Sequence, residues 1–212
     1  MRPKTMVSWI MYLLLIGFAC YAILLQIYDR PALSRLCRED GIIEWLTSIF
    51  YFLASFIFIY TCKKEGFKNV WYWGFFILFL LIAGEEISWG QRLFEFSTPG
   101  LLKDLNIQKE TNLHNIKGIH GSIRGLGLLI VFGICYIIPI TNKFVGWARS
   151  FYRKRKMPIY PLWLMGLPTV AVLFMAIPRL LFNEAVFNLD EMGEIYLSIG
   201  FLLFSLSESK LT

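Results

Sequence analysis

Residues 84–120 read GEEISWGQRLFEFSTPGLLKDLNIQKETNLHNIKGIH, and this stretch begins where a hydrophobic run is still long enough to lie within a membrane. Two adjacent carboxylates, Glu85 and Glu86, follow the apolar run FFILFLLIA (residues 75–83), with only Gly84 between. An ionised side chain inside a bilayer is costly unless it has a partner or a function. The pair therefore predicts a polar site at the end of a membrane helix.

Five polar side chains recur at every second position further along the same stretch. An extended backbone places alternate residues on one face, whereas a helix would scatter them around its axis. We therefore predict an extended polar segment in a long loop (90–118), together with a short interfacial helix near residues 99–105. Such a segment could bind a glycan or lipid headgroup, or it could only satisfy the backbone of a folded loop. The five side chains are Asn106, Gln108, Glu110, Asn112 and His114.

Composition places the chain among integral membrane proteins. Hydrophobic residues make up 57% of its 212 residues, whereas soluble domains contain roughly 45–50% even with glycine counted. Several nearly uncharged runs approach the ~20 residues that a helix needs to cross a hydrocarbon core of ~30 Å. We predict an all-α polytopic helical bundle that forms a single membrane domain, residues 1–212. The six predicted spans are residues 6–28, 42–62, 70–89, 119–140, 160–182 and 192–206, with 90–118 as the functional loop.

The distribution of Lys and Arg predicts the orientation. With six spans, 12 of them fall on the side of the N-terminus and seven on the other side, which favours cytoplasmic termini in a cell (inner or plasma) membrane. The strongest block is residues 153–156. A five-span alternative, in which the last run lies at the interface, would put the tail outside. Because the basic residues cluster in short loops, we attribute the net charge of +6 to topology and expect no nucleic-acid partner.

Proline, glycine and cysteine add local expectations. Pro161, Pro168 and Pro178 predict a kinked or broken fifth span, and the glycines at 121, 125 and 127 predict close helix contact near the start of the fourth. The four cysteines form no CxxC pair and imply no disulfide framework.

Under the six-span topology, ionisable side chains from five spans share one depth at the outer face. Intramembrane ionisable groups normally face one another, a cavity or an ion path, so we predict a shared polar site. The alternative is that each one is solvated separately at the headgroup layer. The set comprises Glu44, Glu85, Glu86, His120, Arg124, Arg179 and Glu194.

Carboxylates and imidazoles suit general acid–base chemistry, or the binding of zinc, iron or manganese. The candidate catalytic residues are Glu85, Glu86, His114 and His120. Glu86 and the two histidines are the candidate ligands of a divalent metal, the cofactor that this set would accept. The spacing HNIKGIH matches no metal signature, and structural histidines are the alternative interpretation. The candidate substrate-binding residues are Arg92, Asn106, Gln108, Glu110, Asn112, Asn115, Arg124 and Arg179.

These ingredients resemble the intramembrane metal hydrolases of the alkaline-ceramidase type, in which acids and histidines gather at one membrane face. The paired HxxxH motif of such chains is absent here, and we assign no family. The first functional prediction is a metal-assisted or acid–base hydrolase or transferase that acts on a lipid or lipid-linked substrate. The alternatives are a proton- or ion-coupled transporter or channel, and a non-catalytic membrane subunit that docks a partner through the loop. Membrane lipid is the expected partner, and a homo-oligomer or a membrane-protein partner fits the same features.

Overall fold

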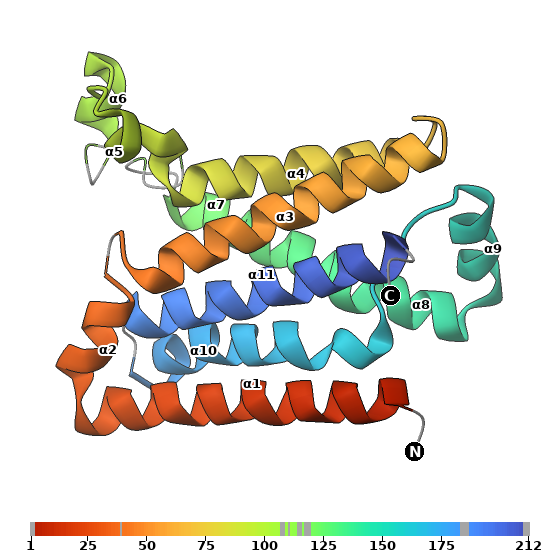
Figure 1. The fold of residues 1–212 in the computed structure, drawn as a ribbon, viewed down its shortest axis with the longest axis horizontal. Coiled ribbons are helices and arrows are strands. Elements are labelled where there is room, and N and C mark those ends of the chain that lie inside the picture. The colour runs from red at the N-terminus through yellow and green to blue at the C-terminus, as the bar shows by residue number, and fades with distance from the viewer. Residues whose placement is uncertain are drawn as a thin grey trace.

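The computed structural model of the chain is a bundle of helices (Figure 1). It describes residues 3–38, 40–106, 109, 111–113, 116, 120–182 and 187–209. Within them it gives no side-chain description for residues 3–8, 92, 101–102, 120–124, 179–182 and 187. These described parts are all-helical, with one isolated bridge between Asn106 and Ile116 and no strand.

Each of the six predicted spans contains a long helix, and shorter helices lie in the connections. The long helices are α1 (Pro3–Tyr28), α3 (Ile42–Lys64), α4 (Val70–Glu86), α7 (His120–Phe132) with α8 (Ile138–Phe144), α10 (Gly166–Phe182) and α11 (Phe187–Ser209). The short ones are α2 (Arg30–Leu36), α5 (Gln91–Phe94), α6 (Gly100–Leu105), α9 (Gly146–Lys154) and the 3-10 turns Ser88–Gly90 and Leu162–Leu164. The helix expected at 99–105 is confirmed as α6, while α2 and α9 were not predicted.

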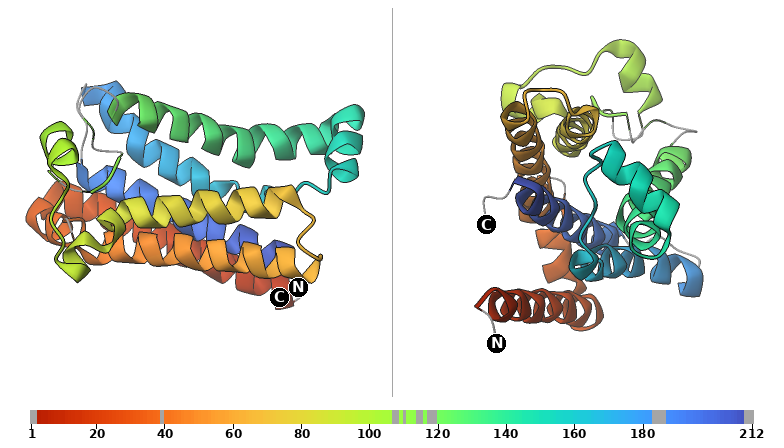
Figure 2. Two further views of the ribbon diagram at one scale, coloured as in Figure 1. Left: turned by 90° about the horizontal axis from the view of Figure 1, so that it is seen from above. Right: turned by 90° about the vertical axis from the view of Figure 1, so that its right-hand side faces the viewer.

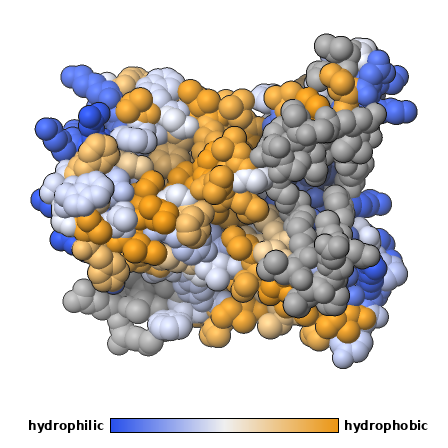
Figure 3. All heavy atoms as spheres, turned by 180° about the vertical axis from the view of Figure 1, so that it is seen from behind, coloured by the Kyte–Doolittle hydropathy of each residue, from blue (hydrophilic) through white to orange (hydrophobic). Residues whose placement is uncertain are grey.

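Three stretches of the described chain are long and apolar enough to cross a membrane: Trp9–Tyr28, Ile42–Lys64 and Gly125–Phe144. The apolar Leu162–Pro178 is shorter. The number of spans, six or five, stays a prediction. Figure 3 shows one face of the molecule, on which hydrophobic side chains form a band and hydrophilic ones gather at its two ends, as expected for a protein that sits in a bilayer.

The long helices run along one axis, so their termini collect at two ends of the bundle (Figure 1). One end holds α2, α5 and α6, together with the last turn of α4 and the first turn of α11. The other holds both chain termini, the turn between α3 and α4, and α9. We refer to them as the acidic end and the basic end, after the charged residues described below.

Proline accounts for the irregular stretches of the bundle. Residues 157–161 are not helical, Leu162–Leu164 form a 3-10 turn, and α10 begins only at Gly166, so the predicted irregularity is found near Pro161, whereas α10 continues through Pro168 and Pro178. Pro139 follows a π-helical segment, Gly133–Ile137, that joins α7 to α8. A π-turn lets the helix continue where proline provides no backbone N–H. Figure 2 shows α7 and α8 as one continuous rod that leads to α9.

Helix α11 packs between α3 and α10, and α3 also packs along α4. An aromatic cluster fills the centre: the ring centroid of Phe58 lies 4.9 Å from that of Phe75 and 5.3 Å from that of Phe204. Two serines of α3 donate to carbonyls of α4, Ser48 to Ala83 at 2.8 Å and Ser55 to Phe76 at 3.0 Å. Hydrogen bonds of this kind help to hold helices together where apolar burial provides no drive between them.

Two glycines of α11 allow close contact, Gly193 with α10 and Gly200 with Tyr160 in the segment before α10. A Cβ atom on Gly193 would lie 2.9 Å from the carbonyl oxygen of Ala171, and one on Gly200 would lie 2.7 Å from the Tyr160 hydroxyl. By contrast, among the described residues a Cβ on Gly125 or Gly127 would meet nothing within 4 Å, and the surroundings of Gly121 are not described. Within the described chain, the close approach lies on α11 and not at Gly125 or Gly127.

We expect Gly193→Val and Gly200→Val each to lower the free energy of unfolding by about 1–3 kcal/mol, because the added methyl groups must displace α10 at Gly193 and the buried Tyr160 side chain at Gly200. The measurement is thermal or denaturant unfolding in detergent. Gly127→Val is the matched control and should change stability far less. Equal losses in all three variants would contradict the packing of α11 described above.

Candidate functional site

Carboxylates from three helices gather at the acidic end. Glu86 ends α4, and the charges of four other carboxylates lie close enough to interact with it. Two of these residues are on α11, one is on the first turn of α3, and one directly precedes Glu86. All five side chains are partly buried. The four neighbours are Glu194, Glu191, Glu44 and Glu85, and we refer to the five together as the acidic cluster.

Two members of the acidic cluster hold the backbone around them. The Glu44 carboxylate accepts a hydrogen bond from the backbone N–H of Asp40. The Glu85 carboxylate accepts from the indole N–H of Trp89 at 2.7 Å and from the backbone N–H of Leu113 at 2.6 Å. Within the described part of the chain, the Glu86 carboxylate accepts none. Glu86 therefore differs from Glu44 and Glu85, whose carboxylates are hydrogen bonded to the backbone around them.

The turn after α4 has an unusual backbone. Ser88, Trp89 and Gly90 have φ values of 47°, 57° and 75°, a left-handed run that reverses the chain. Non-glycine residues in this region cost about 1–2 kcal/mol each, so other contacts must hold them there. The Trp89 ring then folds back over Gly84, where a Cβ atom would lie only 2.9 Å from it. Gly84 separates the apolar run from the two glutamates because a larger residue would collide with this indole.

A buried amide cluster connects the loop to this turn. Asn112 donates from its side-chain amide to the Ser88 hydroxyl at 3.0 Å. Asn106 donates to both oxygens of Asn112, at 2.7 Å to the side chain and at 2.8 Å to the backbone. All three residues are at most 2% exposed. Together with the bond from Leu113 to Glu85, these contacts form what we call the loop clamp.

A second set of hydrogen bonds closes the loop around Gln91. Its side-chain amide donates to the Thr98 hydroxyl at 2.7 Å, and its amide oxygen accepts from the backbone N–H of Thr111 at 2.7 Å. The Thr98 hydroxyl in turn donates to the carbonyl of Lys109 at 2.7 Å. These bonds join segments that are 7 to 20 residues apart.

The prediction of an extended polar segment is wrong between Asn106 and Asn112. Six residues of extended chain would separate their Cα atoms by about 20 Å, yet their side chains are hydrogen bonded to each other. The backbone N–H of Lys109 also bonds to the carbonyl of Asn106, which marks a turn. The two asparagines fold the loop, because buried amides need hydrogen-bond partners and find them in each other.

Several candidate residues fall outside the described parts. Gln108, Glu110, His114 and Asn115 lie outside the described residues, and the side chains of Arg92, His120, Arg124 and Arg179 are not described. By their backbone, Arg92 is on α5, His120 and Arg124 are in the first turns of α7, and Arg179 is near the end of α10. These helix ends lie at the acidic end (Figure 1). Among the described residues no group of three or more His, Cys, Asp or Glu could hold a metal ion. The metal set Glu86, His114 and His120 stays a prediction.

The structure adds two residues to this end that the sequence did not single out. Glu191 lies one turn before Glu194 on α11, and this i, i+3 spacing was a usable signal. Cys37 caps α2, is buried, and lies near Glu191. Burial first, and the charge of Glu191 second, raise the pKa of the Cys37 thiol to about 12. The thiol is therefore protonated at neutral pH and is a poor nucleophile or metal ligand.

Fold and site together define a helical chain with apolar stretches of membrane-crossing length and a carboxylate cluster at one end of its bundle. Comparison with protein-family models, curated proteins and solved structures finds no match.

We expect Asn112→Ala to loosen the loop, because it removes the side-chain oxygen that accepts from the Asn106 amide and the side-chain amide that donates to the Ser88 hydroxyl. Losing these buried hydrogen bonds should cost about 1–3 kcal/mol of local stability. Backbone hydrogen exchange across residues 88–113 should therefore accelerate by about tenfold or more. Asn142→Ala, at the basic end, is the matched control and should leave exchange in the loop unchanged. Unchanged exchange in Asn112→Ala would mean that the loop clamp does not hold this segment.

Proposed function

We propose that the chain is a polytopic membrane protein that performs acid–base chemistry on a lipid or lipid-linked substrate at the extracytoplasmic face. The observation that carries this proposal is the meeting of carboxylates from α3, α4 and α11 around Glu86. Clustered carboxylates in an environment of low dielectric share protons, and they are a frequent source of general acids and bases. The concentration of Lys and Arg at the opposite end supports placing this end outside.

In this proposal the residues have separate tasks. Glu86 transfers the proton, since within the described chain its carboxylate is not engaged in a hydrogen bond. Glu85 positions the loop through Trp89 and Leu113. His114 and His120 would complete the acid–base pair or a metal site, and Arg124 or Arg179 would hold an anionic headgroup. Hydrolase or transferase chemistry fits such a set.

A substrate at this end would meet an apolar surface. Trp89, Leu93 and Phe94 on the loop are exposed at 44%, 58% and 76%. Exposed aromatic and aliphatic side chains beside a polar site favour a substrate that remains in the membrane interface. A lipid or a lipid-linked molecule fits both the polar site and the apolar surface, because its polar group is joined directly to an apolar anchor.

Proton- or ion-coupled transport is the second candidate. The acidic cluster is shared by three separate helices, and carboxylates arranged in this way serve as proton or cation sites in transporters. The two functions can be told apart by their products: a transporter moves protons or ions across the bilayer, whereas an enzyme changes the chemical structure of the lipid.

The test uses proteoliposomes made from a bacterial polar lipid extract, with a pH-sensitive dye inside. We expect the wild type to convert a lipid species, followed by mass spectrometry, and Glu86→Gln to lower the rate by about 100-fold or more. Glu95→Gln, an exposed carboxylate on the same loop, is the control and should keep the activity. Equal unfolding midpoints in detergent confirm that the variants are folded.

Three outcomes separate the alternatives. A lipid conversion that Glu86→Gln leaves intact would contradict the role of Glu86. If the wild type carries a proton flux that Glu86→Gln abolishes, and no lipid is converted, the transporter proposal would be favoured over the enzyme proposal. Metal bound in stoichiometric amount, and lost in His114→Ala, would support the metal-assisted form of the reaction.

A further inference from the structure

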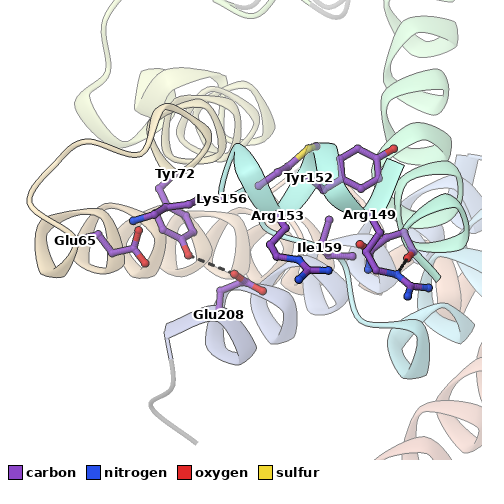
Figure 4. A pocket seen from close by; sticks show the side chains of 10 residues that line it. Glu65, Tyr72, Arg149, Tyr152, Arg153, Lys156, Ile159 and Glu208 are labelled. Carbon is purple, nitrogen blue, oxygen red and sulfur yellow. Dashed lines mark hydrogen bonds between the residues drawn. The ribbon is translucent and has the colours of Figure 1, made fainter. Parts of the chain in front are cut away.

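A hollow of about 500 Å³ lies at the basic end, between the turn after α3, the first turn of α4, α9 and the last turn of α11 (Figure 4). Three cationic side chains line it: Arg149 and Arg153 on α9, and Lys156 just beyond. Glu65 and Glu208 also line it. The Arg153 guanidinium points into the space between Glu208 and Arg149 in Figure 4.

The walls of this hollow are built by specific contacts. Asn69, which caps α4, donates from its side chain to the carbonyl of Lys156 at 2.9 Å and so ties the turn before α4 to the end of α9. Tyr72 on α4 donates its hydroxyl to Glu208 at 3.3 Å. Arg149 donates from Nε to the carbonyl of Asn142 at 2.8 Å. One carboxylate and one guanidinium are therefore partly engaged, whereas Arg153 presents its guanidinium to the space.

The surroundings are strongly cationic. The described segments 63–69 and 141–159 carry nine Lys and Arg and one acid, Glu65. Glu208 is the nearby acid of α11. This excess favours an anionic occupant of the hollow, because the potential of the whole end is positive.

Helix α9 has the features of an interfacial helix. Trp147 and Phe151 are one turn apart and both exposed, Trp147 by 77%, while Arg149 and Arg153 occupy a neighbouring face. Arg155 stacks on Phe151, with its guanidinium carbon 5.6 Å from the ring centroid. Helices with basic residues beside exposed aromatic ones lie in the headgroup layer of membranes.

A second hollow continues from the first. It measures about 400 Å³, shares Asn142, Arg149 and Ile159 with the first, and adds Lys143 at its edge and the apolar Pro139 and Leu162. A free phosphate would use only the cationic part. A phospholipid would use both hollows, with its phosphate in the cationic one and its acyl chains along the adjoining apolar residues.

We propose that the basic end binds one anionic phospholipid, with its phosphodiester between Arg149, Arg153 and Lys156 and its acyl chains along Pro139, Ile159 and Leu162. Guanidinium and ammonium groups bind phosphate through charge-assisted hydrogen bonds, and Arg presents two parallel donors. The site lies at the opposite end from the acidic cluster and is independent of the function proposed for Glu86.

The test measures the anisotropy of phosphatidylglycerol labelled on an acyl chain, titrated with the full-length protein in non-ionic detergent. Salt of about 1 M reduces the Debye length to about 3 Å and removes long-range attraction. We expect unlabelled phosphatidylglycerol to compete and phosphatidylcholine to compete poorly. Arg153→Gln with Lys156→Gln should weaken binding by about tenfold or more, the effect of losing charged hydrogen bonds.

The matched control is Lys154→Gln with Arg155→Gln, which removes the same charge from the same segment outside the hollow. It should change binding by less than about threefold, since screening leaves only direct contacts. The single variants Arg153→Gln and Lys156→Gln provide the same comparison if the double variant has a lowered unfolding midpoint. Equal weakening in both double variants, or no preference for phosphatidylglycerol, would overturn the proposal. Displacement of the lipid by sn-glycerol 3-phosphate or inorganic phosphate at equal concentration would overturn it in favour of a soluble anion.

Discussion

The close packing of α11 between α3 and α10 is the contact on which the rest of the structure depends. Gly193 lets α11 approach α10, Gly200 makes room for Tyr160 just before α10, and Phe204 enters the aromatic cluster beside Phe58. Because a helix is rigid along its length, this packing also places both of its ends. Its first turns bring Glu191 and Glu194 to Glu86, and its last turn brings Glu208 to Tyr72. Both polar regions of the molecule therefore rely on one apolar contact.

The two ends of the bundle differ in how their charged side chains are arranged. The acidic cluster brings like charges together, which is electrostatically costly while the carboxylates are ionised. The basic end spreads its charges over a helix and two turns at the surface, where each remains close to water or to lipid headgroups. The first arrangement is the basis of the proposed acid–base function, and the second is the basis of the proposed phospholipid site.

The loop after α4 shows how a polar segment can be held against an apolar bundle. Its buried amides satisfy one another, with Asn106 and Asn112 at the centre and Ser88 at the edge. These hydrogen bonds offset the cost of the left-handed backbone at Ser88 and Trp89. As a result, Glu85 is a structural partner of the loop, while Glu86, its neighbour in the chain, faces the other carboxylates. Adjacent residues on a helix diverge by about 100°, so the two glutamates reach different surroundings.

The sequence by itself determined the helical class, the approximate positions of the long helices, the irregular start of the fifth run and the α6 helix, but it placed the starts of α10 and α11 five or six residues away from where they lie. Hydrophobicity, charge and proline act on the chain locally, so the residues themselves carry this information. Only the tertiary structure decided that Asn106 folds back on Asn112, that Glu191 joins the acidic cluster, and that α11 rather than α7 has the close-packed glycines. Each of these features depends on contacts between residues far apart in the chain or on the rotation of a helix about its axis. A pattern of alternating polar residues, or a single glycine, does not specify such contacts or such a rotation.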